Sequence, residues 1–147
     1  VTYPPKPRHI RMETIFSKII AGTIPCEKVY EDDRILAFLD INPVNHGHTL
    51  VVPKEHATNI FDVTPQTLAG MAEVAQKVAT AQTTALGCNG VNLVMNNGQA
   101  AGQEVPHIHL HVIPRFTDDG KMPRPHKTPY ENDEANTVAA KLASAID

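Results

Sequence analysis

The sequence predicts a single α+β domain, in which a mostly antiparallel sheet is covered by helices. The expected order of elements is helix, strands, helix, strands, helix, without the strand-helix-strand alternation that parallel sheets require. The 147 residues, 41% of them hydrophobic, provide one ordinary core. Residues 107–112 alternate histidine with aliphatic residues, which is the period-2 pattern of a strand.

A flexible leader and a short helix are expected first. Residues 1–12 are rich in proline and basic residues and lack periodicity, so they are predicted to be a flexible leader before a domain of residues 13–147. Thr14 can cap a helix that Gly22 and Pro25 end. The apolar stripe of this helix consists of Ile15, Phe16, Ile19 and Ile20.

Three strands and a long helix follow. Residues 28–31 and 35–39 have the spacing and turn residues of a hairpin, and residues 49–52 predict a third strand. The helix is expected to begin at Thr64-Pro65 and to close at Gly87. Its predicted core face consists of Leu68, Met71, Ala72, Ala75, Val78, Ala79 and Leu86.

Two further strands and a helix complete the domain. A glycine-bearing loop separates a fourth strand, residues 91–95, from the histidine strand, so the two are expected to pair as antiparallel neighbours. The segment after Arg115 is polar and contains prolines. A C-terminal helix is expected from about Glu131, with one side formed by Ala135, Val138, Ala139 and Leu142.

Composition excludes several classes of function. The net charge is −3 and no run of lysine and arginine occurs, so nucleic acid is not an expected partner. No stretch approaches the roughly 18 apolar residues of a membrane span, and no apolar signal core is present, so we expect a cytoplasmic protein without a membrane partner. Cys26 and Cys88 make neither a disulfide framework nor a close metal pair.

The histidine strand presents three imidazoles on one face. Ile108, Leu110 and Val112 are expected in the core, which leaves the histidines to line an open, polar surface. Their positions are His107, His109 and His111.

Such a row supports two chemistries. It can bind zinc with a further ligand such as His46, His48 or His56. Alternatively, one imidazole attacks phosphorus while its neighbours donate hydrogen bonds to phosphate oxygens. The preceding loop favours phosphate, because its amides and glycines let donors approach an anion. These loop residues are Asn96, Gly98, Gly102 and Gln103.

The same residues carry a family resemblance. Residues 107–113, His-Ile-His-Leu-His-Val-Ile, resemble the signature of the histidine triad (HIT) family of nucleotide-binding proteins, and residues 102–107 resemble its lead-in. Collinear matches extend the resemblance to roughly residues 14–115, at positions 15–25, 31–33, 37–43 and 47–53. The pattern favours the Hint-like and bacterial branch.

The resemblance implies a homodimer without a cofactor that acts at the α-phosphorus of purine nucleotides such as AMP or GMP conjugates. By position, His109 would be the nucleophile that forms a nucleotidyl-histidine. A backbone carbonyl near His107 would fix the tautomer of His109, His111 would donate to the phosphate, and His48 would orient these histidines. The resemblance thus implies a catalytic set of His107, His109, His111 and His48.

The resemblance also implies the nucleotide-binding residues. Asp40 would accept hydrogen bonds from the ribose hydroxyls, although it could instead cap the loop through Asn42 and Pro43. The phosphate would be held by Asn96, Gly102, Gln103 and the backbone N–H groups around Glu104 and Val105. The base would lie in an apolar slot formed by Phe16, Ile19, Ile24, Phe38, Leu39 and Ile41. Without the resemblance, all of these except Leu39 would be read as plain core.

Two departures from the family pattern matter. Many bacterial relatives have Cys-x-x-Cys where this chain has Thr14 and Ser17, so the structural zinc site is expected to be absent and no metal is predicted. Glu104 stands where Hint-like members often have serine near the leaving group. An ionised carboxylate there would repel a phosphate, and one with a raised pKa would act as an acid.

The sequence therefore predicts a metal-independent hydrolase or nucleotidyl transferase for purine nucleoside 5′-phosphoramidates. Three alternatives remain open. They are a dinucleoside polyphosphate hydrolase or phosphorylase, a nucleotide-binding regulatory protein with incidental hydrolysis, and a zinc hydrolase.

Overall fold

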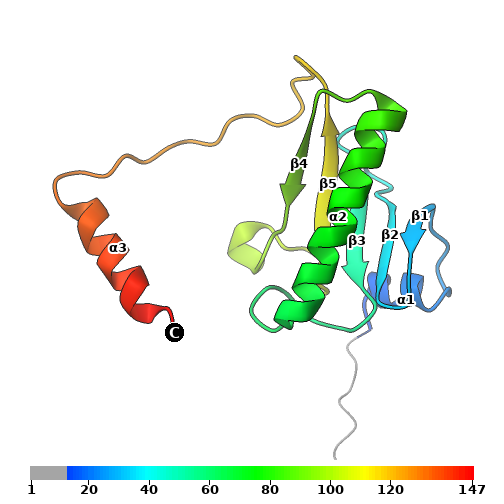
Figure 1. Ribbon diagram of the computed structural model, residues 1–147, viewed down its shortest axis with the longest axis horizontal. Coiled ribbons are helices and arrows are strands. Elements are labelled where there is room, and N and C mark those ends of the chain that lie inside the picture. The colour runs from blue at the N-terminus through cyan, green and yellow to red at the C-terminus, as the bar shows by residue number, and fades with distance from the viewer. Residues whose placement is uncertain (1–12) are drawn as a thin grey trace, which may run out of the picture.

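A computed structural model describes residues 13–147, and the predicted leader lies outside the described residues. The α+β class is confirmed: one five-stranded sheet has the order β1-β2-β3-β5-β4, and all neighbouring strands are antiparallel (Figure 1). The elements are α1 (Ile15–Ile20), β1 (Lys28–Glu31), β2 (Ile35–Leu39), β3 (Thr49–Pro53), α2 (Pro65–Leu86), β4 (Gly90–Val94), the 3-10 helix η1 (Gln99–Ala101), β5 (Leu110–Arg115) and α3 (Glu134–Ala145).

The helix ends follow from local chemistry. Thr14 and Ser17 form a capping box on α1, since each side-chain oxygen accepts from the backbone N–H of the other residue, at 3.1 and 2.8 Å. Thr64 caps α2 ahead of Pro65, and Gly87 ends α2 in the left-handed conformation with φ of 66°. These boundaries are those that the sequence predicts.

The main core lies between α2 and one face of the sheet. The buried residues of α2 are Thr67, Met71, Val74, Ala75, Val78 and Gln82. The predicted core face was partly wrong, since Ala72 and Leu86 are exposed and Leu68 is half-buried. The helix is turned so that Gln82 enters the core, where its amide donates to the carbonyls of Gly47 and Val112, both at 2.9 Å.

A smaller core lies on the opposite face under α1. Phe16 packs edge-to-face on Phe38, with 5.7 Å between ring centroids. The other buried members are Leu36, Leu50 and Val52. Because α1 has only six residues, it covers only part of this face, and the histidines lie beside it.

The expectation that three helices cover the sheet is wrong for α3. This helix begins at Glu134, three residues later than predicted, and all its residues are exposed. Figure 1 shows α3 standing apart from the sheet at the end of an extended segment. No helix within residues 13–147 is long and apolar enough to cross a membrane.

Candidate active site

Two of the three histidines, His107 and His109, are buried rather than lining an open surface, which corrects the prediction for them, whereas His111 is half-buried. His107 is 1% exposed and His109 is 7% exposed, and both precede β5, which begins at Leu110. The reason is α1: the Phe16 ring lies edge-on to both imidazoles, with centroids 6.1 Å from His107 and 4.9 Å from His109. On the other face Ile108 is buried in the α2 core, as predicted.

His109 has one ring nitrogen fixed and one free. Its Nδ1–H donates to the backbone carbonyl of His107 at 2.7 Å, which is the hydrogen bond that the resemblance implies. Nε2 therefore carries a lone pair, and the side chain lines a cavity. Burial lowers the pKa of His109, against the opposing effects of the His107 carbonyl and the carboxylates of Asp40 and Glu104. The imidazole is thus neutral at pH 7 and suited to nucleophilic attack.

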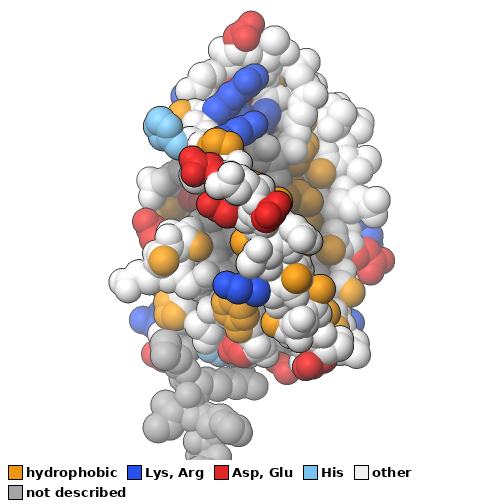
Figure 2. All heavy atoms as spheres, turned by 90° about the vertical axis from the view of Figure 1, so that its left-hand side faces the viewer, with side chains coloured by type: hydrophobic (Ala, Val, Ile, Leu, Met, Phe, Trp, Pro, Cys, Tyr) orange, Lys and Arg blue, Asp and Glu red, His pale blue; other side chains and the backbone are white. Residues whose placement is uncertain are grey.

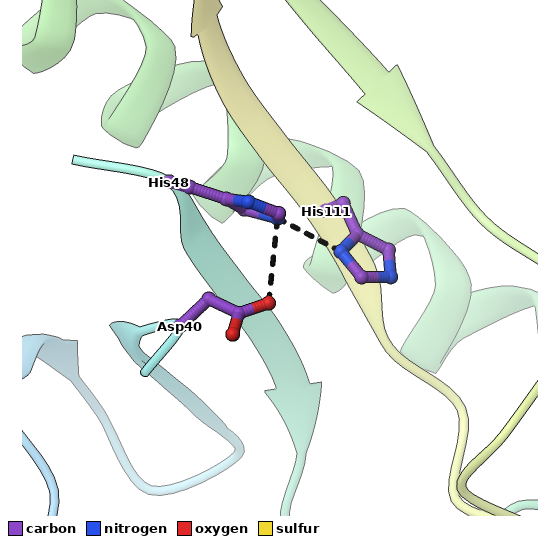
Figure 3. A group of neighbouring side chains, drawn as sticks. All are labelled: Asp40, His48 and His111. Atoms are coloured by element: carbon purple, nitrogen blue, oxygen red, sulfur yellow. Dashed lines mark hydrogen bonds and ion pairs between the residues drawn. The ribbon is translucent and has the colours of Figure 1, made fainter. Parts of the chain in front are cut away.

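His48 and His111 form a directed hydrogen-bond chain (Figure 3). The backbone N–H of Val44 donates to Nδ1 of His48 at 3.0 Å, so the proton of a neutral His48 is on Nε2. That Nε2–H donates to Nδ1 of His111 at 2.9 Å. A neutral His111 then carries its own proton on Nε2, which makes it a hydrogen-bond donor, and its side chain lines the same cavity as His109.

Asp40 completes this group, and both predicted functions of its carboxylate remain compatible with its position. Oδ1 accepts from the backbone N–H of Asn42 at 2.8 Å, which is the loop-capping alternative. Oδ2 lies 3.6 Å from Nε2 of His48. The side chain also lines the cavity.

A metal ion fits this group poorly. The ligand atoms of Asp40, His48 and His111 lie within 4.8 Å of one another. However, Nε2 of His48 has to carry a proton as long as Nδ1 accepts from Val44, and a metal needs that lone pair. Binding would also break the contact between His48 and His111. The close approach of Asp40, His48 and His111 is therefore better explained by the hydrogen-bond chain than by a metal site.

The cavity has a volume of about 630 Å³, which is in the range of small-molecule sites. It brings together most of the predicted nucleotide-binding residues: Phe16, Ile19, Ile24, Phe38, Leu39, Asp40, Ile41, Asn96, Gly102, Glu104 and Val105. The sequence reasoning missed Ile15, Pro25, Cys26, Asn42 and Leu50. The alternation of β3 places Leu50 on the face opposite Val51, but no local pattern distinguishes Cys26.

Gln103 has a different role from the one predicted. Its side-chain amide donates to the carbonyls of Thr58 and Val105 at 2.6 and 3.0 Å, and its Oε1 accepts from Gly98 at 2.8 Å. The side chain therefore ties two loops together and does not line the cavity. Because the loop is fixed in this way, the backbone N–H groups of Glu104 and Val105 are left without an acceptor among the described residues.

The side chain of His107, like that of Gln103, hydrogen-bonds within the protein. Its Nε2–H donates to the carbonyl of Pro53 at 2.9 Å, and its ring does not line the cavity. Its buried Nδ1 has no hydrogen-bond partner among the described residues. The carbonyl of His107 accepts from Nδ1–H of His109, so the contact between these two residues is made through the backbone of His107.

The buried histidines predict acid sensitivity of the fold. Burial lowers the pKa of His48, His107 and His109, and lowers that of His111 to about 4. The unfolded chain takes up protons near pH 6.5 while the folded chain does not, so the free energy of unfolding falls as the pH drops from about 6.5 toward 4. Above about pH 6.5 these histidines are neutral in both the folded and the unfolded chain, so they do not change the free energy of unfolding with pH.

Urea unfolding between pH 7.5 and 4.5 measures this effect. A His111→Asn variant should show a smaller slope, whereas His46→Asn, at an exposed histidine, should keep the slope of the parent. A flat profile in the parent protein would contradict the buried neutral state.

Comparisons with known proteins find similar sequences and structures in one family. A family model for the HIT domain matches residues 21–118. An uncharacterized HIT-like protein of Methanocaldococcus jannaschii is 49% identical over 108 residues, which are 74% of this chain and 83% of that protein. The crystal structure of a HIT family protein from Bacillus anthracis matches with a TM-score of 0.83 and 42% identity, covering 90% of this chain and 96% of that one.

Two relatives have names that state an activity. The adenosine 5′-monophosphoramidase of Schizosaccharomyces pombe is 43% identical over 108 residues, which are 74% of this chain and 78% of that protein. The adenylylsulfatase HINT3 of Arabidopsis thaliana is 42% identical over 110 residues, which are 75% of this chain but only 56% of that protein. Family model, relatives and fold agree with the histidine signature, and the chain therefore belongs to the histidine triad family.

Proposed function

We propose that this protein hydrolyses, or transfers the nucleotidyl group of, purine nucleoside 5′-phosphoramidates through a covalent intermediate on His109. The observation that carries the proposal is the state of His109: a neutral imidazole with Nδ1–H held by the His107 carbonyl and Nε2 available in the cavity. Members of the histidine triad family act as nucleotide hydrolases or transferases.

The reaction has two displacements at phosphorus. In the first, Nε2 of His109 forms a bond to the α-phosphorus, the phosphorus–nitrogen bond breaks, and the departing amine takes up a proton. In the second, a water oxygen bonds to phosphorus, the bond to His109 breaks, and the nucleotide and a proton are released. The Nε2–H of His111 and the backbone N–H groups of Glu104 and Val105 stabilise the phosphoryl oxygens.

The rest of the cavity suits the nucleoside. The side chains of α1 and β2 provide an apolar slot for a base, and Asp40, which directly follows β2, lines the same cavity and is proposed to accept from the ribose hydroxyls. Edge contacts between rings hold Phe16 against Phe38 and His109, which keeps this slot open beside the nucleophile.

The charge of the cavity favours phosphoramidates over dinucleoside polyphosphates. Among the described residues that line it, Asp40 and Glu104 are acidic and none is lysine or arginine. A nucleoside phosphoramidate brings one negative charge to the site, whereas a polyphosphate brings several. Each additional charge meets repulsion that the neutral histidines do not offset.

A substrate comparison tests the proposal. Adenosine phosphoramidate should have the highest kcat/KM, ahead of diadenosine tetraphosphate and adenylyl sulfate, with and without EDTA. Glu104→Gln should raise kcat/KM for diadenosine tetraphosphate and adenylyl sulfate, the two substrates with anionic leaving groups, by roughly 5- to 10-fold. The reason is that the substitution removes one negative charge from the cavity. Glu55→Gln, at an exposed glutamate that does not line the cavity, is the matched control.

Other results would select another function. A preference for the tetraphosphate would identify a dinucleoside polyphosphate hydrolase, and activity lost with EDTA would identify a metal enzyme. Saturable AMP binding with negligible turnover of all three compounds would identify a regulatory nucleotide-binding protein.

The proposal includes a homodimer, a cytoplasmic location and a family domain that extends from residue 13 to the C-terminal helix.

A further inference from the structure

An ion pair at the end of β5 is shielded from solvent although it lies outside the cavity. Figure 2 shows small groups of basic and acidic side chains interspersed on the face that carries α3, as is usual for solvated surface charges. Arg115 and Asp119 differ from these, because their side chains are only 24% and 8% exposed. Nε of Arg115 donates to Oδ2 of Asp119 at 2.9 Å, and Nη2 donates to Oδ1 at 2.6 Å. Such a bidentate pair fixes both side chains in one geometry.

The carboxylate of Asp119 has further donors besides the arginine. The backbone N–H groups of Phe116 and Lys121 donate to it at 3.0 and 3.1 Å, which closes the turn after β5. The side-chain amide of Asn45, from a loop 74 residues earlier, donates to Oδ2 at 3.0 Å. The Arg115 guanidinium, and next the backbone N–H of Phe116, hold the pKa of Asp119 well below its usual range. The carboxylate is therefore ionised at neutral pH and holds Asn45 by a charge-assisted hydrogen bond.

Asn45 lies in the loop between β2 and β3, and the tip of this loop is largely exposed, at residues 41–43 and 46. Nδ2 of Asn45 also donates to the carbonyl of Pro114 at 2.9 Å, so one amide group joins the loop to the end of β5. Gln82 holds the later part of the loop through the carbonyl of Gly47, at 2.9 Å. The contacts of Asn45 therefore fix the earlier part.

The part of the loop that Asn45 anchors also selects the tautomer of His48. The carbonyl of Asn45 accepts from the backbone N–H of His48 at 3.0 Å, and the backbone N–H of Val44 donates to Nδ1 of the same histidine at 3.0 Å. These two bonds close a turn over residues 44–48. While Val44 donates to Nδ1, the proton of a neutral His48 stays on Nε2, and that Nε2–H in turn occupies Nδ1 of His111.

We propose that Asp119 and Asn45 are positioning residues, which act through the turn of residues 44–48 to keep the proton of His111 on Nε2. Neither side chain lines the cavity, so neither has to contact a substrate. In the other tautomer, Nε2 of His111 carries a lone pair, which repels a phosphoryl oxygen instead of donating to it. The inference rests on the proposed function only where it concerns turnover, because the tautomer of His111 is a property of the free protein.

Nitrogen NMR of the imidazole rings in the full-length protein tests the inference without any substrate. At about pH 7.5 burial keeps His48 and His111 neutral, and the ring-nitrogen chemical shifts distinguish a protonated nitrogen from a bare one. Asn45→Ala removes the link and leaves the ion pair of β5 in place, and Asp119→Ala removes the link from the other side. In both variants the ring nitrogens of His48 and His111 should move toward averaged shifts, since both tautomers become populated.

His109 is an internal reference in these spectra, because the carbonyl of His107 fixes its tautomer independently of the loop. His46→Ala is the matched control, since it changes an exposed side chain in the same turn. Unchanged ring shifts in a folded Asn45→Ala protein would overturn the inference. Equal changes at all three histidines would overturn it too, because they would show a general loosening of the domain.

Turnover of adenosine phosphoramidate separates this inference from the proposed reaction. Asn45→Ala should lower kcat by roughly 2- to 10-fold with little change in KM, and it should lower kcat no further when added to His48→Ala. A contact that is merely structural would cost the same factor in both backgrounds, which would overturn the inference. Altered tautomers with an unchanged kcat would support the positioning of His111 and would count against its role as a donor in the proposed reaction.

Discussion

Replacing His109 with alanine should reduce turnover of adenosine phosphoramidate by about 10⁴-fold or more, while the protein still binds AMP. The imidazole supplies the attacking lone pair, and no other described residue that lines the cavity has a free nitrogen fixed in the same way. The apolar slot and Asp40 are unchanged by the substitution, so nucleotide affinity should change far less than kcat.

Steady-state kinetics and AMP titration by calorimetry measure the two effects. His46→Ala is the control, because His46 is exposed and does not line this cavity. Rapid quenching in an alkaline denaturant with substrate labelled at the nucleotide should leave label on the parent protein and none on His109→Ala, because the phosphorus–nitrogen bond to histidine is stable in base and labile in acid. Near-normal turnover in the variant would exclude His109 as the nucleophile.

Replacing His111 with alanine should lower kcat by about 10²- to 10³-fold, which is the usual cost of losing one preorganised donor to a developing oxyanion. The donor state of His111 depends on the chain from Val44 through His48. His48→Ala should therefore cost less, about 10-fold, because His111 remains but can adopt the other tautomer.

A double variant of His48 and His111 tests whether His48 only positions His111 or also acts on the substrate itself. If His48 acts only through His111, then adding His48→Ala to His111→Ala should reduce kcat no further. Fully additive effects in the double variant would show that His48 contacts the substrate by another route. Thermal unfolding of each variant checks that the loss is not caused by instability, since His48 is only 4% exposed.

The edges of most elements could be predicted because they depend on neighbours in the sequence. The capping box of Thr14 and Ser17 and the left-handed Gly87 act within one helical turn, and the alternation of residues 107–112 sets which side chains share a face. The proposed nucleophile was assigned from the family resemblance, and the carbonyl that fixes the ring of His109 is only two residues away.

The environment of these residues depends on distant parts of the chain. Phe16 on α1 covers His107 and His109, which alternation alone leaves open. Gln103 bonds to Thr58 because a loop 45 residues earlier folds against it. The amphipathic pattern of α3 specifies an apolar side but not the surface that covers it.

The sequence by itself therefore determined the elements, the shared face of the histidines and the family. Only the tertiary structure decided which polar groups are buried, which are already paired and which remain free to act. The physical reason is that backbone conformation responds to residues within a few positions, whereas desolvation and hydrogen-bond satisfaction depend on whatever the fold brings into contact.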